Sequence, residues 1–87
     1  MPVISQVRPF TGHPGEIIAV LIEGDVLSTT TDVNFGPGIV VQSFHIIDDG
    51  KITVSILIEA DTHLGPRDVI VETPTGYDVM PGGFTVN

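Results

Sequence analysis

Three histidines are the residues of this chain best suited to bind a transition metal. They occupy positions 13, 45 and 63, and the chain has no cysteine. Zinc sites take their ligands mainly from histidine, cysteine and carboxylate side chains, usually with pairs only a few residues apart. Because His13, His45 and His63 form no such pair, we predict no zinc site. The lack of cysteine also excludes disulfides and thiolate chemistry.

The eleven Asp and Glu residues are the other side chains that could bind a metal. Asp48 and Asp49 are adjacent, and Glu59 lies close to Asp61. Calcium prefers carboxylate and carbonyl oxygens, but the Asp-x-Asp-x-Asp-Gly loop that often supplies them is absent. We therefore expect a polar hairpin tip at Asp48 and Asp49 and a strand end at Glu59, with no metal at either.

Motifs for catalysis are absent as well. The chain contains no Gly-x-Ser-x-Gly elbow for a nucleophilic serine. No pair of carboxylates stands out as the acid and base of a glycoside hydrolase. Gly36-Pro37-Gly38 lacks the lysine and the following helix of a phosphate-binding loop. We predict that the protein is not an enzyme, with no catalytic residue and no cofactor.

The aromatic residues offer little for binding sugars by stacking. The chain has no tryptophan and one tyrosine, Tyr77. Its four phenylalanines are expected to lie mostly in the core; they are Phe10, Phe35, Phe44 and Phe84. Carbohydrate therefore remains only an alternative partner.

The charge of the chain disfavours polyanionic partners. Its net charge is −8, and its only basic residues are Arg8, Lys51 and Arg67. Nucleic-acid affinity comes largely from neutralised phosphates, and anionic membranes attract basic segments. No apolar run approaches the ~20 residues of a membrane helix, and the first five residues do not resemble a signal peptide. We expect no nucleic-acid partner and no membrane insertion.

The elements that would position these residues are β-strands in one domain, residues 1–87. Seven Pro and ten Gly divide the chain into short pieces rich in Val, Ile, Thr and Phe, which is typical of strands. Such spacing indicates a sandwich or a barrel. The seven predicted strands are Val3–Arg8, Glu16–Glu23, Asp32–Phe35, Ile39–Ile47, Lys51–Glu59, Arg67–Thr73 and Gly83–Val86.

Alternation along two strands predicts the core. Ile52, Val54, Ile56 and Ile58 share one face of the fifth predicted strand, and Val69 and Val71 share one face of the sixth. We expect Val54, Ile56, Val69 and Val71 to meet in one core between two sheets. Asp49-Gly50 between two apolar strands predicts a hairpin. Pro74-Thr75-Gly76 and Pro81-Gly82-Gly83 predict turns.

The order of the turn and strand pieces resembles the IPT/TIG family of immunoglobulin-like domains. The resemblance runs nearly the whole length and implies an all-β, immunoglobulin-like antiparallel sandwich of about seven strands. The matching pieces are Pro9, Gly12 and Gly15, then Ile22-Glu23-Gly24, Val33-Asn34-Phe35-Gly36, Gly65–Val71, Pro74-Thr75-Gly76 and Phe84-Thr85-Val86.

One predicted strand is apolar on both faces, from Ile17 to Ile22. In the family pattern Ile18, Val20 and Ile22 face the core, which leaves Ile17, Ala19 and Leu21 outside. Leu57 joins them if the second and fifth predicted strands pair. We predict a partner-binding face at Ile17, Ala19, Leu21 and Leu57, since apolar residues on both faces of a strand usually mean that both are covered. The alternatives are tolerated exposed aliphatics and cover by the chain's own N-terminal segment.

The family is functionally diverse. Its members include spacer and adhesion modules of cell-surface proteins, accessory domains of carbohydrate-active enzymes and dimerisation halves of transcription factors; the acidic charge argues against the last. We expect a non-catalytic structural or interaction module with protein partners, placed outside the cell, on the cell surface or on a virion. If the chain is a whole gene product, a virion decoration protein is indicated. The alternative is a carbohydrate-binding accessory domain of a secreted enzyme.

Overall fold

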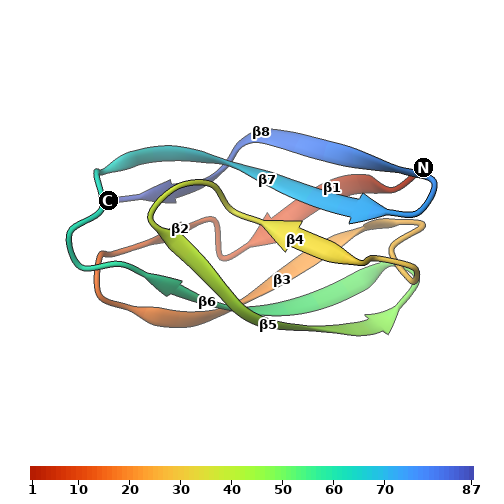
Figure 1. The fold of residues 1–87 in the computed structure, drawn as a ribbon, viewed down its shortest axis with the longest axis horizontal. Helices are drawn as coiled ribbons and strands as arrows, with labels where there is room; N and C mark the ends of the chain where they lie inside the picture. The colour runs from red at the N-terminus through yellow and green to blue at the C-terminus, as the bar shows by residue number, and fades with distance from the viewer.

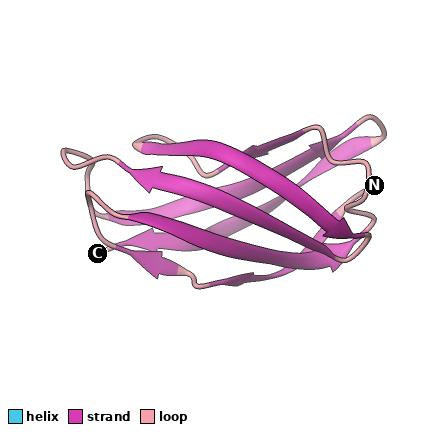
Figure 2. Cartoon of the chain, turned by 90° about the horizontal axis from the view of Figure 1, so that it is seen from below, coloured by secondary structure: helices cyan, strands magenta, loops and turns pink.

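Eight strands in two four-stranded sheets form the computed structural model, which describes residues 1–87. The sheets lie over one another and enclose the core, and the ends of the chain lie at opposite ends of the long axis (Figures 1 and 2). The strands are β1 (Val3–Arg8), β2 (Thr11–Gly12), β3 (Ile17–Asp25), β4 (Asp32–Asn34), β5 (Ile39–Asp48), β6 (Lys51–Ile58), β7 (Gly65–Thr73) and β8 (Gly76–Val86).

The strand order matches that of a constant-type immunoglobulin sandwich. One sheet has the order β1-β3-β6-β5, and the other has the order β2-β8-β7-β4. All pairs are antiparallel except β2 with β8, which is parallel. If β1 and β2 are counted as one divided strand, these are the ABED and CFG sheets of that fold. The expected all-β sandwich is therefore confirmed.

The eighth strand arises because the first strand divides between the two sheets. β1 pairs with β3 up to Arg8, and Thr11–Gly12 then pairs with Thr85–Val86 of β8 in the other sheet. The sequence did not predict β2, because two residues leave no detectable alternation.

The last strand is much longer than predicted. β8 begins at Gly76, whereas Pro81-Gly82-Gly83 was expected to be a turn that precedes a short strand. In the structure these residues bulge opposite Asp68, since Arg67 pairs with Phe84 and Val69 pairs with Met80. The Asp68 carboxylate accepts a hydrogen bond from the Gly82 N–H at 2.9 Å. The bulge accommodates a proline inside a strand, which a regular ladder would not.

The core has the composition that alternation predicted. Val54, Ile56, Val69 and Val71 are almost completely buried, together with Ile52 and Ile58. The Phe35 and Phe84 rings meet edge to face with centroids 5.6 Å apart, a favourable aromatic geometry. The expectation of mostly buried phenylalanines is wrong for Phe10, which is 64% exposed, while Phe44 is half-buried. Phe10 follows the proline where the chain changes sheets, so no strand turns it inward.

Arg67 is a buried cation that ties together the loops at one end of the sandwich. Its Nε donates to the Pro37 carbonyl at 2.8 Å, and its two other nitrogens donate to Thr62 Oγ1 and to the carbonyls of His63, Gly65 and Pro66. No carboxylate lies within ion-pairing distance of Arg67; the one ion pair of the molecule joins Arg8 and Glu23. Five N–H donors meet five oxygens, so the guanidinium is fully hydrogen-bonded although buried.

Candidate interaction surface

Aliphatic side chains cross the outer face of the β1-β3-β6-β5 sheet. Ile17 on β3 pairs with Leu57 on β6, and Leu57 pairs with Val40 on β5. Because directly opposed residues point to the same face, the three form a continuous row. Ile17 is 63% exposed and Val40 is 45% exposed, with Leu57 half-buried between them. We call Ile17, Leu57 and Val40 the aliphatic row; Figure 2 looks onto this sheet from below.

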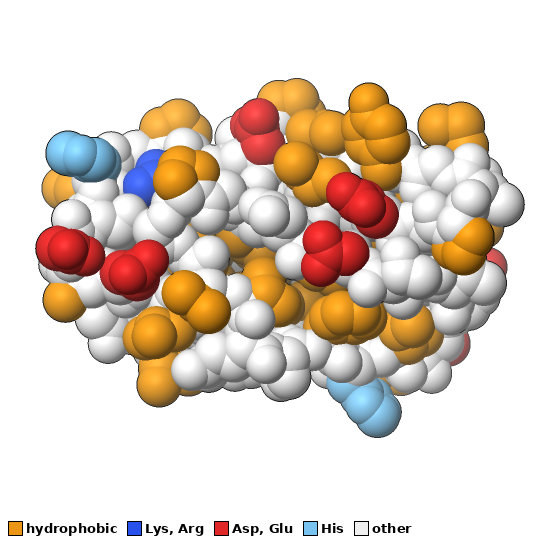
Figure 3. Space-filling model, viewed as in Figure 1, with side chains coloured by type: hydrophobic (Ala, Val, Ile, Leu, Met, Phe, Trp, Pro, Cys, Tyr) orange, Lys and Arg blue, Asp and Glu red, His pale blue; other side chains and the backbone are white.

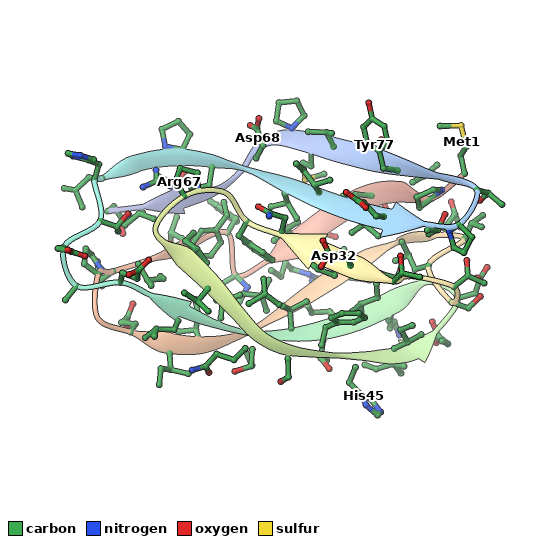
Figure 4. All side chains as sticks on the ribbon, in the orientation of Figure 1. Met1, Asp32, His45, Arg67, Asp68 and Tyr77 are labelled. Atoms are coloured by element: carbon green, nitrogen blue, oxygen red, sulfur yellow. The ribbon has the colours of Figure 1, made fainter.

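The next row of this face is uncharged, since Ala19 pairs with Ser55. Leu21 in the row after it pairs with Thr53 and, on its other side, with Arg8. His45 on β5 lies beside Thr53, and Figure 4 shows its side chain directed away from the sandwich. The charged residues of the paired strands lie toward the other end of this face. The basic ones are Arg8 and Lys51, and the acidic ones are Glu23, Asp25 and Asp48. The face therefore carries a net charge of only −1 in a protein of net charge −8.

The four residues predicted from the sequence to bind a partner lie together on this outer face. β3 and β6 pair as expected, which brings Leu57 beside Ile17. Ile17 and Ala19 are exposed, while Leu21 and Leu57 are half-buried by their neighbours. The inward assignment also holds, since Val20 and Ile22 are buried and Ile18 packs partly against the core. That this face binds a partner remains a prediction.

One alternative for the face is excluded by the structure. The N-terminal segment does not cover it, because Val3–Arg8 lies in the plane of the sheet as an edge strand, paired with Leu21–Asp25. Val40 was missed by the sequence analysis. It stands within an apolar run, Ile39-Val40-Val41, but only the β5–β6 register places it beside Leu57.

The outer face of the opposite sheet is acidic. Asp32 on β4 is directly opposed to Glu72 on β7, and Asp68 lies further along β7. Figure 3 shows acidic side chains over this region and a single basic patch, at the position that Figure 4 labels Arg67. Tyr77 is 60% exposed and pairs with Glu72 at the start of β8. The two faces of the sandwich thus differ in charge.

The side chains considered for metal chemistry are not brought together. His13 and His63 lie in loops, and His45 lies on β5. No group of three His, Asp or Glu side chains has a geometry that could hold a metal ion. Asp48 and Asp49 lie at a hairpin tip as expected, where Asp48 Oδ1 accepts from the Gly50 N–H at 2.8 Å.

Asp49 joins this hairpin tip to the loop after β3. Ser28 donates hydrogen bonds to its carboxylate from the hydroxyl and from the backbone N–H, and these lower the pKa of Asp49 below its ordinary 3.8. The Asp49 carbonyl also accepts from the Leu27 N–H at 2.8 Å. These contacts hold the loop after β3 against the β5–β6 hairpin.

The surface contains no detectable pocket. A helix of the length and apolarity needed to span a membrane is not found. Neither a protein-family model nor a curated protein sequence matches the chain.

Proposed function

We propose that this chain is a non-catalytic interaction module of the IPT/TIG type, which docks onto a neighbouring protein through the outer face of the β1-β3-β6-β5 sheet. The observation that carries the proposal is the aliphatic row on a face with a net charge of only −1. Removing exposed aliphatic surface from water stabilises a complex by roughly 25 cal/mol per Å². A face with so little net charge also repels an acidic partner less than the rest of this acidic molecule does.

The shape of the molecule supports a structural role. The chain enters at one end of the long axis and leaves at the other (Figure 1). Such a module can be joined end to end with others while the sides of its sheets remain free. This shape suits a spacer, an adhesion unit or an accessory subunit on a cell surface, outside the cell or on a virion. The family assignment rests on the resemblance of the turn and strand pieces and fits the strand order.

The test is a paired substitution in the aliphatic row. Ile17→Ser with Leu57→Ser removes two opposed aliphatic side chains that contribute little to the core, so the variant should remain folded. Isolated from its native source together with its neighbours, it should lose the partner that accompanies the unsubstituted chain. The control is Leu64→Ser with Tyr77→Ser, which removes two exposed apolar side chains elsewhere. Undiminished co-purification of the folded Ile17/Leu57 variant contradicts the proposal.

The second candidate function is carbohydrate binding, and the exposure of Tyr77 and Phe10 favours it. Exposed aromatic rings can stack on sugars. The two rings do not form one platform, because Tyr77 lies at the start of β8, whereas the Phe10 carbonyl accepts a hydrogen bond from the Thr85 N–H near the end of that strand. Titration calorimetry against common polysaccharides tests this function. Binding abolished by Tyr77→Ala or Phe10→Ala supports it, and no heat with any polysaccharide removes it.

A further inference from the structure

The edge of the sandwich at β5 is the long strand edge that nothing covers. β5 is ten residues long, contains neither Pro nor Lys, and pairs with β6 alone. Its other edge therefore presents backbone N–H and C=O groups without a strand partner. Exposed apolar edges of this kind pair readily with another strand, and proteins usually protect them with Pro, Lys, short strands or covering groups.

The other edges of the molecule have such protection. β4 has three residues and β2 has two. At β1, the Ile4 N–H donates to the Asp78 carboxylate of the facing sheet at 2.7 Å, so a side chain occupies that edge. β5 stands apart in length and in lacking a capping side chain.

A bulge gives β5 a sequence of inward and outward side chains that is the same in both directions along the strand. The register shifts between Val41 and Ser43, where Gln42 is the extra residue and its Oε1 accepts from Ser55 on the outer face. Opposed residues share a face, so the partners on β6 assign each side chain of β5. The inward residues are Ile39, Val41, Phe44 and Ile46, and the outward ones are Val40, Gln42, Ser43 and His45. From Ile39 to Ile46 the order is in, out, in, out, out, in, out, in.

We propose that β5 pairs antiparallel with β5 of a second copy of this chain, about a two-fold axis between Gln42 and Ser43. In this register the two side chains of every opposed pair lie on the same face of the sheet. A strand without the central bulge would not give this match about the same axis. The opposed pairs are Gln42 with Ser43, Val41 with Phe44, Val40 with His45 and Ile39 with Ile46 of the second copy. The β1-β3-β6-β5 sheet of one copy and the same sheet of the second copy then form one continuous sheet of eight strands.

The pairing also buries apolar groups that the single copy leaves half-exposed. Val41, Phe44 and Ile46 face inward yet stay half-buried, because β4 in the facing sheet is short. In the dimer these side chains pack against their counterparts across the axis. An isologous contact of this kind closes at two copies and leaves no further edge of the same type.

The charges predict how the dimer responds to salt. Residues 39–46 contain no Asp, Glu, Lys or Arg, so the contact itself is free of like-charge pairs. Each copy nevertheless carries a net charge of −8, and the two repel at long range. Salt screens such repulsion, so the dimer should strengthen as ionic strength rises. The contact uses the β5 edge and does not depend on the proposed function of the outer face.

Sedimentation of charge variants tests the contact. Gln42→Lys with Ser43→Lys places four lysines around the axis and should raise the dimer dissociation constant about a hundredfold. Gln42→Glu with Ser43→Glu should do the same, and an equal mixture of the two variants should restore a heterodimer. The matched control, Ser5→Lys with Gln6→Lys, alters exposed residues of the opposite edge strand and should leave the dimer intact. Ile17→Ser with Leu57→Ser should also leave it intact, which separates this proposal from the proposed function.

Cysteine cross-linking tests the register, since the chain has no cysteine of its own. Val40→Cys with His45→Cys should give a covalent dimer on mild oxidation. The two positions are about 16 Å apart within one strand, too far for an internal disulfide. Val41→Cys with His45→Cys is the control and should not cross-link. A chain that stays monomeric into the millimolar range at high salt, a dimer that survives the lysines, or equal cross-linking of both cysteine pairs overturns the proposal.

Discussion

At the scale of single residues, Arg67 shows how a buried charge can serve the fold without an ion pair. Its guanidinium donates to oxygens of the β4–β5 turn, of the loop before β7 and of β7 itself. Hydrogen bonds to a charged group contribute more than neutral ones, and losing them leaves buried carbonyls unsatisfied. One side chain thus holds three backbone segments in place. The same saturation leaves it no donor for an anionic ligand.

We predict that Arg67→Met destabilises the domain by about 3 kcal/mol, because it retains the side-chain volume but removes all five donors. Arg8→Met is the matched control. It breaks the exposed ion pair with Glu23 and should cost less than about 1 kcal/mol. Urea denaturation of both variants measures the difference. Equal losses of stability would show that the Arg67 hydrogen bonds contribute no more than a surface pair.

Asp49 predicts a dependence of stability on pH at the same scale. The hydrogen bonds from Ser28 hold its folded-state pKa below the ordinary 3.8. A lowered folded-state pKa means that ionised Asp49 stabilises the fold above pH 3.8 and that this contribution disappears as pH falls through the folded-state value. Thermal unfolding of Asp49→Asn should therefore show a smaller loss of stability below pH 4 than the unsubstituted chain. Identical acid dependence in the two proteins would contradict the assignment.

At the scale of the strands, alternation assigns one face of each element to the interior. β6 shows the full alternating pattern, with its buried residues opposite the inward-facing residues of β3 and β5. β7 contributes Val69 and Val71 from the facing sheet. A domain of this size has few other buried residues that could compensate for a defect.

We predict that Val69→Asp unfolds the domain, because it places an unpaired charge in a small apolar core. Thr53→Asp is the control; it introduces the same charge on the outward side of β6, where the residue is half-exposed. Circular dichroism should show loss of the folded signal for Val69→Asp and retention for Thr53→Asp. A parental melting temperature for the Val69 variant would mean that its face is wrongly assigned.

At the scale of the whole molecule, charge is distributed unequally over the two faces. Asp32, Asp68 and Glu72 stand on the outer face of the β2-β8-β7-β4 sheet, while the charges on the other face sum to only −1. An acidic molecule with a single ion pair repels itself, and screening by salt should stabilise it. One face is therefore better suited than the other to contact an acidic neighbour.

We predict that divalent cations stabilise the domain only through ionic strength. A cation bound specifically to the folded state would raise the melting temperature with its concentration. Millimolar calcium should therefore give the same melting temperature as sodium chloride of matched ionic strength. A rise of several degrees beyond that control, reversed by a chelator, would reveal a site that the sequence and the structure do not show.

The sequence by itself determined the features that depend on neighbours along the chain. Gly and Pro placed most strand ends, with β1 at its predicted bounds, and the period of two along β6 and β7 identified the core residues. In β3, which is apolar on both faces, the family resemblance assigned Ile17, Ala19 and Leu21 to the outer face. These features are local, because the faces of a strand are set by its own alternation.

Only the tertiary structure decided the features that depend on register and sheet order. The β5–β6 register brought Val40 beside Leu57, and the bulge at Gln42 reversed the orientation of the residues from Ser43 to Ile46. The order of the strands placed β5 at the edge of its sheet. Pairing with β7 kept β8 one strand through Pro81, where the sequence predicted a turn. A shift of one residue exchanges the two faces of a strand. Registers are fixed by contacts between segments distant in sequence, so local patterns do not contain them.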